Sequence, residues 1–280
     1  MGLTPTDEIM AAAYARGRGV GAFNVIQIEH AEALVAGATM AGAPVILQIS
    51  ENAVAYHGAL APIGLATLAI ARAAEVPVAV HLDHATRPTL VREAISLGFG
   101  SVMFDGSSLA YEKNVEATAG IVAECHAAGL AVEAELGEVG GKDGVHAPGV
   151  RTDPDEAAAF VRTTGIDALA IAVGTSHAMT SKDASIDLEL IARHRATAGV
   201  PLVLHGSSGV PDDQLTAAVH AGMTKINIAT SLNVAFTEAV RSYLDAEPSV
   251  VDTRKYLAAG RRAVTEEVRR LLAEVLLAAG

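Results

Sequence analysis

The chain has 280 residues, of which 51% are hydrophobic and 19% charged, and its formal net charge is −12. This length suffices for a large core, and the acidic balance argues against nucleic acid or an anionic membrane as a partner. The single cysteine, Cys125, excludes an intrachain disulfide, and without a signal-peptide or membrane-span pattern we expect a cytoplasmic protein.

Strand-like and helix-like segments alternate regularly along the chain. Eight such units predict an α/β protein with a (β/α)8 TIM barrel, one domain over residues 1–280, and an additional C-terminal helix. An open, doubly wound sheet is the alternative, because alternation does not prove closure. The expected strands are 19–25, 44–49, 77–82, 101–104, 131–136, 168–173, 201–204 and 225–228. The expected helices are 27–42, 62–76, 89–97, 111–128, one starting at 153, 186–197, 211–221, 232–244 and 248–280.

Three histidines lie at the C-terminal ends of predicted strands, where barrel enzymes build their active sites. They are His84, His177 and His205, on the third, sixth and seventh strands. One such histidine is more often a hydrogen-bonded core residue, but three in equivalent positions favour a metal. Three neutral imidazoles with an open fourth position make a catalytic zinc site. We interpret His81, near the same strand end, as structural or as a support for a ligand.

Two carboxylates accompany these histidines. Asp83 precedes His84 and, in the alternation of a strand, shares a face with His81 rather than with His84. It is well placed to exchange a proton with a substrate hydroxyl. Glu135 ends the fifth strand on the same face as Glu133. Its role stays open between orienting a zinc-bound imidazole and binding a second cation, for which a monovalent ion is the candidate.

A second cluster points to an anionic ligand. The Gly-Ser-Ser run at 206–208 follows the seventh strand, and the segment 227–230 ends the eighth. Many barrels hold a phosphate at these positions, on backbone N–H groups and hydroxyls. Ser50 and Lys182 are further candidate contacts, although each alone is as readily explained as a solvated surface group.

Together, several motifs closely resemble the class II, zinc-dependent ketose-bisphosphate aldolases, which act on fructose- or tagatose-bisphosphate. The resemblance spans nearly the whole chain and implies reversible cleavage of a phosphorylated ketose to dihydroxyacetone phosphate and an aldehyde. It rests on Ala22-Phe23-Asn24, Leu82-Asp83-His84, Glu133-Ala134-Glu135-Leu136-Gly137, Gly174-Thr175-Ser176-His177, the run 203–208, Lys225-Ile226-Asn227 and Thr253-Arg254-Lys255-Tyr256.

The resemblance also implies roles for individual residues. A zinc held by His84, His177 and His205 would act as a Lewis acid, and Asp83 would exchange the proton of the substrate's C4 hydroxyl. Arg254 would reach the far phosphate from a neighbouring subunit, which implies a homodimer or homotetramer. The candidate substrate-binding residues are Asn24, Ser50, Lys182, Gly206, Ser207, Ser208, Asn227, Ala229, Thr230 and Arg254.

Within the family, two details favour the tagatose-bisphosphate branch. Ala229 stands where many fructose enzymes carry Asp or Asn, and His177 and Lys182 are five residues apart. One departure from the family is Ala178, which follows His177 where glycine is usual.

The loop after the fifth strand departs from the family pattern as well. The family's loop, Gly-Gly-Glu-Glu-Asp or similar, carries a glutamate that moves the C3 proton. Residues 140–144 read Gly-Gly-Lys-Asp-Gly, one residue short, so Asp143 or Glu138 is the candidate for this step. The glycine-rich stretch 137–151 lacks a helical or strand pattern and predicts a lid over the bound ligand.

Two other functions stay open at this point. A metal-dependent hydrolase would use the same three histidines with a metal-bound water and a base, often with a second metal. A sugar-phosphate-binding barrel that has lost catalysis would explain the altered loop. The phosphate-binding turns and the adjacency of Asp83 and His84 favour the aldolase, for which sugar acids, deoxy sugars and sulfonated sugars are alternative substrates.

Overall fold

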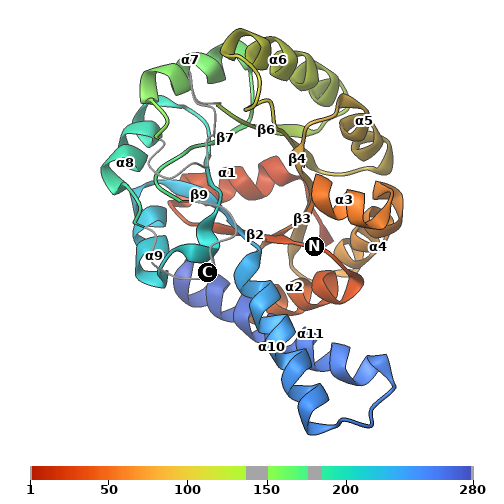
Figure 1. The fold of residues 1–280 in the computed structure, drawn as a ribbon. Coiled ribbons are helices and arrows are strands. Elements are labelled where there is room, and N and C mark those ends of the chain that lie inside the picture. Colours follow the sequence, from red (N-terminus) through yellow and green to blue (C-terminus); the bar gives the residue numbers. More distant parts are fainter. Residues whose placement is uncertain (1, 137–150, 176–184, 279–280) are drawn as a thin grey trace.

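The computed structural model describes residues 2–136, 151–175 and 185–278. Eight parallel strands form a closed ring in the order β4-β3-β2-β9-β8-β7-β6-β5, and β5 pairs back onto β4 (Figure 1). The predicted (β/α)8 barrel is confirmed, and the open sheet is excluded. The strands are β1 (Gly2–Leu3), β2 (Val20–Asn24), β3 (Val45–Ser50), β4 (Pro77–Ala85), β5 (Ser101–Phe104), β6 (Ala131–Glu135), β7 (Ala168–Ala170), β8 (Leu202–Leu204) and β9 (Met223–Ile228).

Helices surround this ring and bury the outward faces of its strands (Figure 1). Several end at a left-handed glycine that satisfies the last carbonyls, as α2 does at Gly42 with φ 63°. The helices are α1 (Thr6–Arg16), α2 (Ile28–Ala41), α3 (Glu51–His57), α4 (Leu60–Ala73), α5 (Pro88–Leu97), α6 (Tyr111–Ala127), α7 (Pro154–Thr164), α8 (Leu188–Thr197), α9 (Asp212–Ala221), α10 (Thr230–Ala246) and α11 (Thr253–Arg270).

Two helices fall outside the predicted alternation. The first, α1, packs Ile9, Met10 and Ala13 against inward-facing apolar residues of the barrel strands, and so closes the N-terminal end of the barrel (Figure 1). The second, α3, has only seven residues and starts directly after β3, where the Ser50 hydroxyl accepts a hydrogen bond from the Ala53 N–H. This short helix places its first turn at the rim of the barrel mouth.

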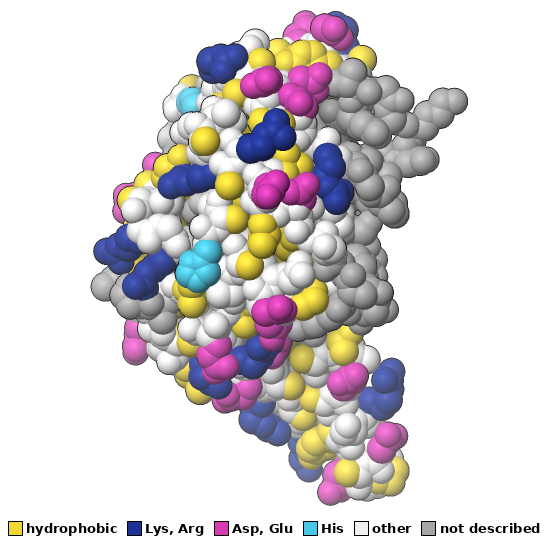
Figure 2. Space-filling view, turned by 90° about the vertical axis from the view of Figure 1, so that its left-hand side faces the viewer, with side chains coloured by type: hydrophobic (Ala, Val, Ile, Leu, Met, Phe, Trp, Pro, Cys, Tyr) yellow, Lys and Arg dark blue, Asp and Glu magenta, His cyan; other side chains and the backbone are white. Residues whose placement is uncertain are grey.

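The C-terminal segment differs from the single long helix predicted over 248–280. The helix α11 starts at Thr253, because the Asp252 side chain caps it by accepting a hydrogen bond from the Arg254 N–H. It continues into a π-helical turn over Leu271–Val275. Helices α10 and α11 form an arm that extends beyond the barrel in two perpendicular views (Figures 1 and 2).

The base of this arm is fixed to the barrel through α2. A Cβ on Gly37 of α2 would lie 2.6 Å from the Thr265 carbonyl oxygen of α11, so only glycine permits this close packing. An ion pair between Glu32 and Arg261 joins the same two helices.

On the face seen in Figure 2, basic, acidic and apolar side chains are interspersed. Among the described residues, no single helix is long and apolar enough to cross a membrane. The bent pair α3 and α4 reaches that length and apolar composition only when its two helices are taken together.

Candidate active site

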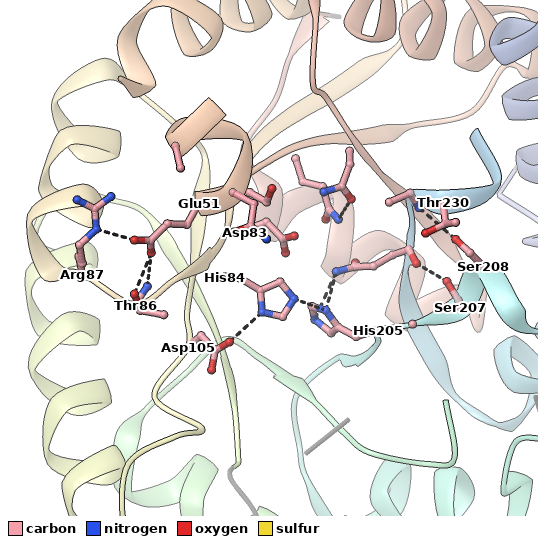
Figure 3. A pocket seen from close by; sticks show the side chains of 18 residues that line it. Glu51, Asp83, His84, Thr86, Arg87, Asp105, His205, Ser207, Ser208 and Thr230 are labelled. Atoms are coloured by element: carbon pink, nitrogen blue, oxygen red, sulfur yellow. Dashed lines mark hydrogen bonds and ion pairs between the residues drawn. The ribbon is translucent and has the colours of Figure 1, made fainter. Parts of the chain in front are cut away.

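A cavity of about 680 Å³ opens at the C-terminal ends of the barrel strands. Its lining comes from strands on opposite sides of the ring, so residues distant in sequence face one another there (Figure 3). The predicted site residues that line it are Asn24, Ser50, Asp83, His84, His205, Gly206, Ser207, Ser208, Asn227, Ala229 and Thr230.

Two of the predicted metal ligands face each other in this cavity. His84 Nε2 lies 3.0 Å from His205 Nδ1. The second nitrogen of each ring is held by a carboxylate: His84 Nδ1 lies 2.9 Å from Asp105 Oδ2, and His205 Nε2 lies 2.9 Å from Glu133 Oε1. Because these carboxylates accept the ring N–H groups, both facing nitrogens carry lone pairs, and the Asn227 Nδ2 group also lies 3.2 Å from His205 Nδ1. Such an arrangement calls for a proton or a cation between the rings.

The donor set fits a metal ion. Two imidazole nitrogens bound to one tetrahedral zinc lie about 3.3 Å apart, close to the separation seen here. Ligand atoms of Asp83, His84 and His205 all lie within 4.8 Å of one another, and so do those of His84, Asp105 and Glu135. A metal-bound imidazole almost always donates its other N–H to a carboxylate or carbonyl, as both of these rings do.

The electrostatics of the cavity also favour a positive charge. Burial lowers the pKa of His84, but Asp83, Asp105 and Glu135 outweigh it and raise the pKa to about 9. Burial would raise the pKa of Asp83, but the charges of His84, His205 and Lys225 outweigh it and lower the pKa. Asp83 is therefore an ionised carboxylate, and its buried Oδ1 accepts no hydrogen bond from the described residues.

The end of β4 departs from the strand alternation expected for it. That alternation puts Asp83 and His84 on opposite faces, yet both line the cavity. The reason is a break in the register between Leu82 and Ala85, where His84 adopts a left-handed φ of 50°. This conformation is uncommon outside glycine and turns the imidazole into the barrel mouth beside Asp83. Strain of this kind gathers at functional sites.

From His205 into the interior of the barrel, buried polar side chains form a continuous column. Glu133 Oε2 accepts a hydrogen bond from Lys225 Nζ at 2.7 Å, and Lys225 Nζ lies 3.4 Å from His81 Nε2. His81 Nδ1 then contacts Ser101 Oγ at 2.7 Å. Burial and the Lys225 charge lower the pKa of His81 to about 3, so this ring is neutral. His81 is thus part of a hydrogen-bonded network that reaches His205 through Lys225 and Glu133, and both interpretations of its role stay open.

The structure adds three residues that the sequence did not single out for a role. Asp105 and Glu133 orient the two imidazoles, and Lys225 compensates the charge of Glu133. Burial would raise the pKa of Glu133, but Lys225 and His205 hold it well below its usual range. For Glu133 and Lys225 the available signal was a charged residue in a strand that is buried on both faces, as all residues of β9 are.

The predicted phosphate-binding turn lies beside His205 at the cavity (Figure 3). Gly206 has a left-handed φ of 66° and leads into a 3-10 turn over Ser207–Gly209. The Ser207 hydroxyl donates to the Asn227 carbonyl, which ties β8 to β9. Helix α10 begins at Thr230, so its first N–H groups and the Ser208 hydroxyl lie at the cavity (Figure 3). Such a helix start attracts anions.

The remaining predicted site residues are not among the described residues that line this cavity. Asp143, Glu138, His177 and Lys182 lie outside the described residues, as does most of the predicted lid. Arg254 lies in the arm, pairs with Asp252, and has a side chain that is 88% exposed. It does not line the cavity of its own chain.

Comparisons with known proteins indicate the family of this chain. A family model described as class-II fructose-bisphosphate aldolase matches residues 4–280. The chain is similar to a fructose-bisphosphate aldolase of Geobacillus stearothermophilus, with 39% identity over 272 residues that cover 96% of this chain and 95% of the relative. Among solved structures it resembles the YdjI aldolase of Escherichia coli K12, with a TM-score of 0.88 and 29% identity over 99% of this chain and 98% of that chain.

Proposed function

Because the chain belongs to the class II fructose-bisphosphate aldolase family, we propose that it reversibly cleaves a ketose bisphosphate of the tagatose or fructose type. The products are dihydroxyacetone phosphate and an aldehyde. The observation that carries this proposal is a single cavity that holds a carboxylate-oriented histidine pair, the ionised Asp83 and an anion-binding turn. The family membership favours this reading over a hydrolase or an inactive binding barrel.

Class II aldolases depend on a metal, and we propose that zinc is the metal of this chain. His84 through Nε2 and His205 through Nδ1 would hold it, with His177 as the third ligand. When bound, it polarises the substrate carbonyl and offsets the negative charge left on the three-carbon fragment. Glu135 remains a candidate ligand for a second ion, with a monovalent cation as the proposed occupant.

The chain's own residues supply the remaining steps. Asp83 is ionised, buried and next to the histidine pair, so it would accept the C4 hydroxyl proton during cleavage. In the reverse direction the same carboxyl would return that proton. We propose that Asp143, or failing that Glu138, moves the proton at C3, and that the segment from 137 to 151 closes over the ligand.

Substrate binding would use both sides of the histidine pair. The phosphate of the dihydroxyacetone half would lie on Gly206, Ser207 and Ser208 and on the start of α10, where hydroxyls and N–H groups gather. Asn24 and Ser50 also line the cavity. Two further candidates for substrate binding are Lys182, which lies outside the described residues, and Arg254, which would come from a neighbouring subunit.

A panel of ketose phosphates tests the proposal. Metal-loaded protein is incubated with tagatose- and fructose-1,6-bisphosphate, the corresponding 1-phosphates, and phosphorylated deoxy sugars and sugar acids. A coupled assay then detects dihydroxyacetone phosphate. We expect release from at least one bisphosphate, with no release by the His205→Ala variant. Hydrolysis to free phosphate without cleavage, or binding without turnover, would instead support one of the two alternatives.

A further inference from the structure

The cavity has a second wall, on the side of the histidine pair away from the phosphate-binding turn. In Figure 3, Arg87, Thr86 and Glu51 lie on one side of His84 and His205, and Ser208 and Thr230 lie on the other. Glu51 opens the short helix α3, and Arg87 directly precedes α5. A ligand held at the turn and at the histidines would extend towards this wall.

The wall is built by a network around one carboxylate. Glu51 Oε2 accepts hydrogen bonds from the Thr86 N–H at 2.7 Å and from the Thr86 hydroxyl at 3.1 Å. Glu51 Oε1 accepts a hydrogen bond from Arg87 Nε at 2.5 Å. Both oxygens are therefore engaged within the protein, and burial, which would raise the pKa of Glu51, is outweighed by these bonds, which lower it. Glu51 acts as a brace that fixes Arg87.

The way in which Arg87 is held leaves its two terminal amino groups available. Arg92, which lies within α5, binds Glu124 through both Nε and Nη2. Arg87 uses Nε alone, and among the described residues neither of its Nη atoms makes a hydrogen bond. Its side chain is 58% exposed at the cavity edge. Those amino groups can form the paired bonds that guanidinium makes with phosphate or carboxylate.

Charge supports the same conclusion. Three carboxylates, from Glu51, Asp83 and Asp105, line the cavity. Among its described lining residues, Arg87 is the only one with a permanent positive charge. An acidic protein that accepts an anionic aldehyde has to concentrate positive charge where the far end of that aldehyde lies.

We propose that Arg87, braced by Glu51, determines specificity for the aldehyde half of the substrate by binding an anionic group at its far end. The group is a phosphate or a carboxylate, which share the required chemistry. This inference rests on the proposed aldolase function and adds a binding residue from the same subunit.

The test measures condensation of dihydroxyacetone phosphate with three aldehydes, namely glyceraldehyde 3-phosphate, 4-oxobutanoate, whose carboxylate lies at its far end, and neutral glyceraldehyde. The readout is the ratio of kcat/KM for each anionic aldehyde to that for glyceraldehyde. Loss of hydrogen bonds to a charged group predicts a fall in this ratio of roughly 10- to 100-fold in Arg87→Met. The anionic aldehyde whose ratio falls further in Arg87→Met shows whether phosphate or carboxylate is the preferred group.

Three further variants separate this role from a general structural one. Arg92→Met removes an arginine of α5, the helix that Arg87 precedes, and should leave the ratio at the wild-type value. Arg87→Lys keeps the charge without the planar fork and should recover part of the ratio. Glu51→Gln should raise the KM for the anionic aldehyde more than it changes kcat, because the brace is weakened while the reacting groups stay in place.

An unchanged ratio in Arg87→Met, or a wild-type protein that does not prefer either anionic aldehyde, overturns the inference and leaves the aldolase function intact. Absence of condensation with every aldehyde contradicts the proposed function and the inference together.

Discussion

The hydrogen-bond partners of a side chain decide which role it can have in the cavity. Asp83 and Asp105 are both acidic and both touch the histidine site, yet their contacts differ. Asp105 is hydrogen-bonded to His84 and to the Ser107 hydroxyl, whereas Asp83 keeps a buried oxygen without a hydrogen bond from the described residues. An ionised oxygen of this kind is suited to accept a proton, and a fully bonded one is suited to orient a ring.

This contrast predicts opposite effects for two matched substitutions. Asp83→Ala should keep its metal and lose turnover by about 100-fold or more, the usual scale for general acid–base catalysis. Asp105→Ala should weaken metal affinity by about 10- to 100-fold and regain turnover at saturating zinc. Metal content by elemental analysis and kcat at saturating zinc check both. If Asp83→Ala loses metal and regains full turnover on reloading, Asp83 supports a ligand instead.

At the scale of elements, the column from His205 to Ser101 joins β8, β6, β9, β4 and β5 inside the barrel. Its central pair is Glu133 and Lys225, both almost fully buried. Removing one member of a buried ion pair leaves an uncompensated charge and costs about 3–5 kcal/mol. The barrel therefore depends on both partners being present together.

Lys225→Met should accordingly lower the free energy of unfolding by about 3–5 kcal/mol. The double variant Lys225→Met with Glu133→Gln should be less destabilised, because it removes both charges. Lys113→Met, on the exposed surface of α6, should change stability by no more than about 0.5 kcal/mol. Urea denaturation of the metal-free proteins at pH 7 measures all three. Equal losses in the single and double variants would contradict the charge-pair account.

The element scale also shows how far sequence reasoning reaches. The alternation of strands and helices, and polar residues at strand ends, predict the barrel and bring Asp83, His84 and His205 to one mouth. The partners Glu133, Asp105 and Lys225 were not predictable, because their contacts join side chains from different strands inside the ring. The turn of His84 into the cavity depends on a left-handed φ, which a period-two pattern does not encode.

At the scale of the whole molecule, the arm of α10 and α11 extends beyond the barrel (Figure 1) and carries exposed apolar side chains. Val251 near its tip is 91% exposed, and Val234 and Leu244 are also exposed. Arg254 lies in the same arm, away from the cavity of its own chain. These features support the prediction that a second copy packs against the arm and receives Arg254.

Sedimentation velocity should therefore find at least a dimer at micromolar concentration. Arg254→Ala should raise the KM for a bisphosphate far more than for the corresponding 1-phosphate, because only the bisphosphate carries the far phosphate. Arg269→Ala, further along the same helix and paired with Glu266, is the control and should leave both KM values unchanged. A fully active monomer would refute this prediction. The expected cytoplasmic location and the expected lack of nucleic-acid and membrane partners stay predictions from the sequence.

The central claim is that this barrel performs metal-dependent aldol cleavage, and a metal titration of activity tests it most directly. The protein is stripped with a chelator, dialysed, and assayed for triose phosphate release from the best ketose bisphosphate as zinc is added back. The account predicts no activity in the stripped protein and recovery that levels off at about one zinc per chain, with no recovery in His84→Ala or His205→Ala. Full activity in the stripped protein, or in either histidine variant without metal, would contradict it.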